Sequence, residues 1–238
     1  MNLIPSRNLR TLVIVCLCVI GIGFPVASSW VFLLDGDRRL AANIMALSYL
    51  IGFYGMFLSP WLKVGDLRDW STWRRLRATV TIWLWTVYLT AVIWELPWLL
   101  FHETIRAAKD ELWAYSWWAY IDGGDIRYAG WDPTIATLEW FTVINALIGL
   151  PVLIHWVRNG RKPGWPLFVF MFTGASHFYQ TMQYYVSQAL QDFAHVGDTA
   201  FDLYVRFFMV NSPWVLLPLC VWCYAWWELS PDAPERES

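Results

Sequence analysis

The chain is poor in charge and in cysteine, and it lacks the loops that bind phosphate groups. Charged residues make up 15% of its 238 residues and the formal net charge is −2, so nothing in the charge favours a nucleic acid partner. All 4 cysteines lie in apolar runs; Cys220-x-x-Cys223 has the spacing of a redox motif, but without a βαβ context we interpret it as apolar filler. There is no glycine-rich phosphate loop, nucleophile elbow or His/Cys metal spacing. The apolar residues are therefore the main signal.

Hydrophobic residues make up 58% of the chain, and 19 residues are Trp. Such a composition is typical of a membrane protein, because a soluble domain could not bury so many apolar residues. A transmembrane helix needs roughly 20 of them in a row. The sequence predicts an all-α integral membrane protein, a bundle of about six transmembrane helices. The first run is too long for a signal peptide and lacks an Ala-x-Ala-like cleavage site. The predicted spans are Thr11–Leu34, Ala41–Leu62, Ala78–Phe101, Thr134–Val157, Trp165–Leu190 and Leu203–Trp226.

Basic residues in the short connections predict the orientation, because Lys and Arg resist translocation. A six-span topology places three basic segments on one side: Arg7 and Arg10; Lys63, Arg68, Arg74, Arg75 and Arg77; and Arg158, Arg161 and Lys162. We therefore expect both termini in the cytosol. Arg38 and Arg39 fall on the other side, where we expect Asp35 and Asp37 to balance them. A topology of five spans, without one of the first two, would reverse the amino terminus only.

Two glutamates, Glu95 and Glu139, lie inside apolar runs near the same membrane face. Glu95 is six residues before the end of its span and Glu139 is five residues after the start of the next. Antiparallel helices bring both to one level, roughly 8–9 Å inside the non-cytosolic boundary. An intramembrane carboxyl group is costly and suggests function. Further polar or aromatic residues share that leaflet or a helix face with them: Trp98, Thr142, His177, Gln180, Tyr184, Asn211 and Trp214.

Acids, amides and aromatic rings around one pocket favour carbocation chemistry. An acid can protonate an olefin or epoxide, ring faces can stabilise the cation, and a base can remove a proton elsewhere. This chemistry requires no cofactor and no metal. The alternative is that these polar groups only hydrogen-bond one helix to another.

The segment Trp118–Tyr128 (WAYIDGGDIRY), with the downstream Glu139 and Thr142, resembles the emopamil-binding protein family, whose shared domain is called EXPERA. The segment Phe208–Pro218 (FMVNSPWVLLP) is similar to the family's Phe-Met-Asn-x-x-Trp run, and Thr72–Leu76 (TWRRL) also fits. The resemblance covers roughly residues 70–228. It implies an EXPERA-like transmembrane domain at 70–228, preceded by transmembrane helices one and two within 1–69 and followed by a disordered cytosolic tail at 229–238. The bundle would then be a five-helix EXPERA-like core with the first span as an addition or a divergent start.

The resemblance implies a sterol Δ8-Δ7 isomerase-like activity in which Glu95 and Glu139 are the acid and base. Thr142 and Asn211 would orient Glu139, and Trp214 would stabilise the cation. Asp125, Arg127 and Tyr128 would order the loop over the pocket. It also implies the endoplasmic reticulum membrane, if the organism is eukaryotic.

Two departures from the family concern the pocket. The isomerases have a His one helical turn before the glutamate of the third span, where this chain has Ala91. They carry Gln and Gly where this chain has His177 and Gln180. Because of these departures, the pocket would use a relocated histidine or a different proton relay.

Three functions remain open from the sequence. The first is an isomerase that shifts a C=C bond in a sterol or related polycyclic isoprenoid. The second is a membrane terpene or meroterpenoid cyclase, because the pair Trp94-Glu95 is similar to the small paxilline-type cyclases. The third is a non-catalytic sterol-binding protein. In each case the partners are a hydrophobic small molecule and membrane lipid, and a homodimer is left open.

Overall fold

The computed structural model describes residues 6–230, which form helices and loops without a β-strand. The all-α prediction is confirmed. Most of the predicted tail, from residue 231 on, lies outside the described residues; Leu229 still belongs to the last helix. The principal helices are α1 (Arg7–Phe32), α2 (Arg38–Leu58), α3 (Thr72–Thr90), α4 (Leu96–Ala107), α5 (Tyr115–Ile121), α6 (Pro133–Arg158), α7 (Trp165–Ala189) and α8 (Pro213–Leu229). Two π-helical segments, η3 (Ala91–Glu95) and η6 (Asp202–Met209), continue into α4 and lead towards α8.

Five helical stretches are long and apolar enough to cross a membrane: Arg7–Phe32, Arg38–Trp61, Thr72–Ala107, Pro133–Arg158 and Asp202–Leu229. They correspond to five of the six predicted spans. The remaining one is α7, which has 25 residues but is not among these stretches. Its polar residues, His177 and Gln180 among them, lower its mean hydropathy. The structure therefore supports a multi-pass membrane bundle, and the sixth span stays a prediction.

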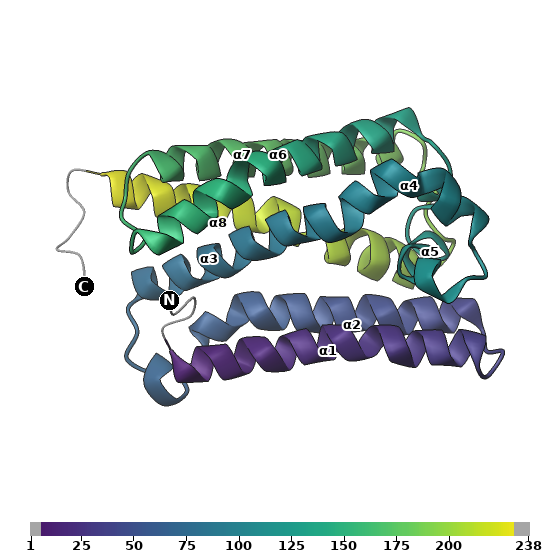
Figure 1. The fold of residues 1–238 in the computed structure, drawn as a ribbon, viewed down its shortest axis with the longest axis horizontal. Helices are drawn as coiled ribbons and strands as arrows, with labels where there is room; N and C mark the ends of the chain where they lie inside the picture. Colours follow the sequence, from purple (N-terminus) through teal and green to yellow (C-terminus); the bar gives the residue numbers. More distant parts are fainter. Residues whose placement is uncertain (1–5, 231–238) are drawn as a thin grey trace.

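The long helices run nearly side by side (Figure 1). The α1–α2 hairpin lies along one side of the bundle, and α2 contacts α3 and α5. The rest of the bundle is formed by α3–η3–α4, α6, α7 and α8, in which α7 packs between α6 and α8. Buried apolar residues form two clusters, one built around Trp83 and Trp156 and the other around Trp98 and Tyr115.

Polar side chains define where several of these helices begin. The Ser6 hydroxyl accepts the Leu9 N–H at 3.0 Å at the start of α1. Asp132 accepts the N–H groups of Thr134 and Ile135 at 2.9 and 3.0 Å, and Pro133 occupies the first turn of α6, where a missing N–H costs nothing. These caps fix the start of the helix that carries Glu139.

The predicted basic connections lie at one end of the bundle, where α1 begins and α6 ends (Figure 1). Arg75 has a structural role there: its buried guanidinium donates to the carbonyls of Pro60 and Leu67, both at 2.6 Å, and so holds the loop between α2 and α3. Which side of a membrane this end faces stays a prediction.

Asp35 and Asp37 balance Arg38 and Arg39 in the charge count of this connection, but they are not the ion-pair partners of these arginines. Arg38 pairs with Asp110 and Asp122, and Arg39 pairs with Asp202, so the positive charge is neutralised by loops and helices distant in sequence. Asp37 instead caps α2 by accepting the Leu40 N–H at 2.7 Å. Local charge counting could not show this, because the partners meet only when the bundle forms.

Candidate functional site

A cavity of about 720 Å³ lies within the bundle and receives side chains from both apolar clusters. That volume lies within the range of small-molecule sites. Most of its wall is aliphatic or aromatic. Its polar lining consists of Thr81, Thr86, Thr90, Glu95, Ser116, Glu139, Thr142, His177, Gln180, Thr181 and Asn211, with the hydroxyls of Tyr49, Tyr120, Tyr128 and Tyr184.

Both π-helical segments lie beside this cavity, and each is followed by a proline. Pro97 stands at the start of α4, two residues after Glu95, and Pro213 stands at the start of α8, two residues after Asn211. A proline cannot donate to the carbonyl four residues earlier and clashes with it, so the preceding turn widens. The Met209 carbonyl, which Pro213 cannot bond, accepts instead from the Ser212 hydroxyl at 2.8 Å. Such widened turns are frequent at functional sites.

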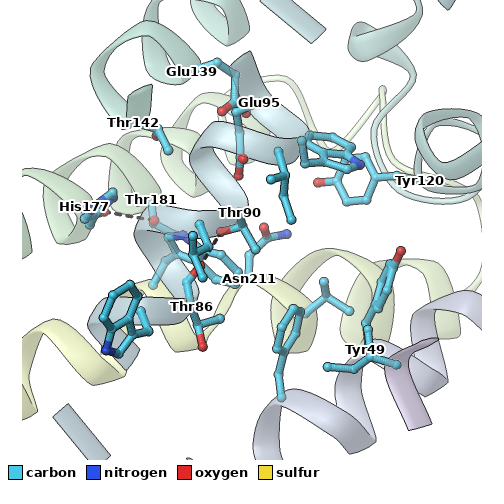
Figure 2. A pocket seen from close by; sticks show the side chains of 18 of the residues that line it. Tyr49, Thr86, Thr90, Glu95, Tyr120, Glu139, Thr142, His177, Thr181 and Asn211 are labelled. Atoms are coloured by element: carbon cyan, nitrogen blue, oxygen red, sulfur yellow. Dashed lines mark hydrogen bonds between the residues drawn. The ribbon is translucent and has the colours of Figure 1, made fainter. Parts of the chain in front are cut away.

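Glu95 and Glu139 lie next to each other at one end of the cavity, as their depth in the sequence predicts (Figure 2). Both are buried. Glu139 accepts a short hydrogen bond from the Tyr128 hydroxyl. The Oε2 atom of Glu95 has no hydrogen-bond partner among the described residues. The pair thus has one engaged carboxyl group and one with a free oxygen.

The tyrosines around the carboxyl pair form a connected group. The Tyr120 and Tyr184 hydroxyls are 3.1 Å apart, and Tyr184 donates to Asp125 at 2.9 Å. The Tyr120 hydroxyl also interacts with the Asn211 amide. Burial, and then the charge of Glu139, raise the pKa of Tyr128, so this hydroxyl keeps its proton and remains a donor.

Asp125 lies behind the cavity wall, with no exposed surface. Its carboxylate accepts from the Arg127 guanidinium at 2.7 Å, from Gln188 at 2.8 Å and from Tyr184. Because a buried charge needs several partners, this cluster fixes the loop that carries Tyr128. The loop-ordering role expected for Asp125 and Arg127 is compatible with these bonds, although neither residue lines the cavity.

On the other wall, α6 and α7 are joined by amide and hydroxyl groups. Thr142 donates to the Gln180 side-chain oxygen at 2.9 Å, and Gln180 in turn donates to Ser176. Asn145 donates to the same Ser176 hydroxyl at 2.8 Å. Thr142 therefore bonds to α7 and not to Glu139, the residue that the family resemblance assigns it to orient.

His177 is 2% exposed and lines the cavity, yet neither ring nitrogen has a partner among residues 6–230. Thr142 and Gln180 are at one level because they are bonded to each other. Glu139 lies three residues from Thr142 in one direction and His177 three residues from Gln180 in the other. His177 is therefore about 9 Å from the carboxyl level along the bundle axis.

Of three further predicted site residues, Trp214 and Asn211 line the cavity and Trp98 lies in the core behind it. Trp214 lines the cavity, and its ring packs edge-on against Trp83 with centroids 5.3 Å apart. Asn211 also lines the cavity, and its amide donates to the Phe207 carbonyl at 2.7 Å. Trp98 does not line it: the indole is fully buried and donates to the Tyr128 carbonyl at 3.1 Å.

Tyr120 and the face of α3 were not among the predicted site residues, although they line the cavity. The α3 face includes Trp85, Thr86 and Thr90, with Thr90 donating to the Thr86 carbonyl at 3.0 Å. The signal that could have found Thr86 and Thr90 is their spacing of four residues on the helix that leads to Glu95. Tyr120 lies in a short loop helix, whose orientation no periodicity reveals.

No group of three or more His, Cys, Asp or Glu residues that could hold a metal ion occurs within the part of the chain that the structure describes. Cys220 and Cys223 are both free thiols. The cavity wall itself carries carboxyl, hydroxyl and amide groups, one imidazole and several aromatic rings. No protein family model, no curated protein and no solved structure matches this chain.

Proposed function

We propose that this protein is an integral-membrane isomerase that shifts a C=C bond in a sterol or related polycyclic isoprenoid. The observation that carries the proposal is the carboxyl pair: Glu95 and Glu139 share one end of an apolar cavity, and one oxygen of Glu95 has no hydrogen-bond partner among the described residues. Buried carboxyl groups without a charged partner are expensive to keep in a membrane bundle. Proton transfer to and from an apolar ligand gives them a use.

In the proposed reaction the neutral Glu95 carboxyl group donates its proton to one carbon of the double bond. A C–H bond forms from the π electrons, and the neighbouring carbon becomes a carbocation. The Glu139 carboxylate then removes a proton from a carbon adjacent to the cation, and the electrons of that C–H bond form the shifted double bond. The substrate gains one proton and loses one, so no oxidant, reductant or cofactor is consumed. Between turnovers Glu139 gives its proton up to solvent and Glu95 takes one from solvent, so both groups return to their starting states.

This assignment of donor and acceptor follows from the hydrogen bonds. Glu139 accepts from Tyr128, which suits a carboxylate, whereas the unpartnered oxygen of Glu95 suits a neutral acid whose proton points at the ligand. Aromatic faces are available for the cation. The Trp94 and Tyr128 rings lie 5.8 Å apart and both line the cavity. Ring faces stabilise cations best when water is absent.

We also propose that α7 crosses the membrane, which makes six spans with both termini in the cytosol. Its polar residues are buried within the bundle, Thr173 and His177 among them. Its outward residues are large and apolar or aromatic: Phe168, Phe172, Tyr179 and Val186 are each more than half exposed. Polar groups inside and apolar groups outside are what a membrane span requires. The resemblance to the emopamil-binding protein family supports the same arrangement and a location in the endoplasmic reticulum.

The test is isomerisation of a Δ8-sterol in heavy water by purified protein, followed by mass spectrometry. We expect a product with a shifted double bond and one deuterium, because the donated proton comes from a carboxyl group in exchange with solvent. Glu139→Gln should retain sterol binding and lose turnover. Glu228→Gln is the matched control, since Glu228 is equally buried but lies outside the cavity; it should keep full activity.

The other outcomes discriminate between the alternatives. A sterol that binds but stays unchanged with the wild-type protein would indicate a binding protein and contradict the isomerase. The adjacent Trp94, Tyr120 and Tyr128 rings, all in the cavity wall, favour a cyclase as second candidate. A cyclase would convert a linear isoprenoid into a ring product of the same mass, and that conversion would depend on Glu95.

A further inference from the structure

We infer that His177 binds a hydroxyl group of the substrate and thereby determines which double bond reaches the carboxyl pair. The inference rests on the proposed function, and it concerns the orientation of the ligand. Its starting point is that the His177 imidazole lines the cavity while both of its nitrogens lack a partner among the described residues. A buried polar group without a partner is rare and calls for an explanation.

The polar neighbours of His177 along α7 bond other groups, and none of them bonds the imidazole. The Thr181 hydroxyl donates to the His177 carbonyl at 3.0 Å, and Thr173 bonds the Tyr88 hydroxyl at 2.7 Å. Gln180 is held by Thr142 and Ser176. We therefore look for its partner in the cavity that His177 lines.

A hydroxyl group matches what the imidazole offers. A neutral imidazole has one N–H donor and one acceptor nitrogen, and a hydroxyl group can donate to the one or accept from the other. A pure hydrocarbon ligand would leave both nitrogens unpaired and bury them more deeply. A polycyclic alcohol is the ligand class that satisfies both the apolar walls and this single polar position.

The position of His177 then defines a direction in the cavity. It lies about 9 Å from the carboxyl pair along the bundle axis, towards the end where α1 begins. The Trp85 indole N–H, also in the cavity wall and without a partner in the described chain, lies on the same side, about 15 Å from Glu95 along α3. Unpaired polar groups thus gather on one side of the carboxyl pair. A rigid alcohol held there presents a fixed carbon to Glu95.

The test compares two radiolabelled probes, a Δ8-sterol alcohol and its 3-deoxy analogue, in equilibrium binding to the full chain in lipid nanodiscs. The wild-type protein should bind the alcohol about tenfold more tightly, the effect of one buried hydrogen bond. His177→Phe should lower affinity for the alcohol alone, so that the ratio falls to about one. Ser187→Ala is the control from the same helix, since the Ser187 hydroxyl donates to the Tyr184 carbonyl at 2.8 Å and lies outside the cavity wall; the ratio should persist.

Two further results keep the inference open to refutation if His177→Phe does not fold. His177→Gln keeps a donor and an acceptor and should retain part of the preference. Equal affinity of the wild-type protein for both probes would overturn the inference and leave water as the partner of His177. If the wild-type protein binds both probes equally but still isomerises the Δ8-sterol in heavy water, the hydroxyl contact is refuted and the proposed isomerase activity is not. Failure of the wild-type protein to bind either probe would refute the sterol class as well.

Discussion

Replacing Tyr128 by Phe should slow the proposed isomerisation without preventing ligand binding. The substitution removes one oxygen, the hydroxyl that donates to Glu139, and retains the ring that packs against Trp98 with centroids 5.2 Å apart. A hydrogen bond to a charged group contributes about 1.5–3 kcal/mol, and each 1.4 kcal/mol corresponds to a factor of ten. If this bond holds Glu139 as the proton acceptor, kcat should fall about 10- to 100-fold.

The assay is the rate of deuterium incorporation into a Δ8-sterol, measured over a range of sterol concentrations to separate kcat from KM. Tyr185→Phe is the matched control: it deletes a hydroxyl that donates to the Phe208 carbonyl at 2.9 Å, outside the cavity wall. We expect that variant to retain wild-type kcat. Unchanged kcat in Tyr128→Phe would show that the hydrogen bond to Glu139 has no role in proton transfer and would refute the assignment of donor and acceptor.

Two predictions concern stability in detergent, measured by thermal unfolding. Asp125→Asn should destabilise the fold by about 3–5 kcal/mol, because it breaks a buried ion pair, whereas Asp110→Asn should cost less than about 1 kcal/mol, since Asp110 is 89% exposed. Gly149→Ala should cost about 1–3 kcal/mol, because the added Cβ would lie 2.2 Å from the ring of Tyr88. Gly130→Ala, where nothing lies within 4 Å, should be nearly neutral, and equal melting temperatures for the two glycine variants would contradict the packing argument.

The helices could be predicted because span length is a property of each segment alone. The apolar run Thr134–Val157 became Pro133–Arg158, and Ala41–Leu62 became Arg38–Trp61. The weak case is α7, where the residues that contribute to the site are the ones that reduce its apolar character. Composition alone therefore fails most readily on a helix whose polar side chains line a cavity.

The meeting of Glu95 and Glu139 was also predictable, because antiparallel neighbours of known length must bring certain positions to one level. The partners of each side chain were not. Thr142 bonds Gln180 on another helix, and Trp98 turns away from the cavity to bond the Tyr128 carbonyl. Such choices depend on helix rotation, which depth arithmetic does not contain.

The prolines explain why helix rotation is hardest to predict from the sequence at the site itself. A regular helix advances about 100° per residue, so a widened turn shifts the face of every residue that follows. Pro97 and Pro213 each impose such a turn beside the cavity, where Glu95 ends one π-helical segment and Asn211 lies just beyond the other. Extrapolating α3 as a regular helix would therefore misplace the face of Glu95. The same prolines that make the face of these residues hard to read from sequence lie two residues beyond Glu95 and Asn211, both of which line the cavity.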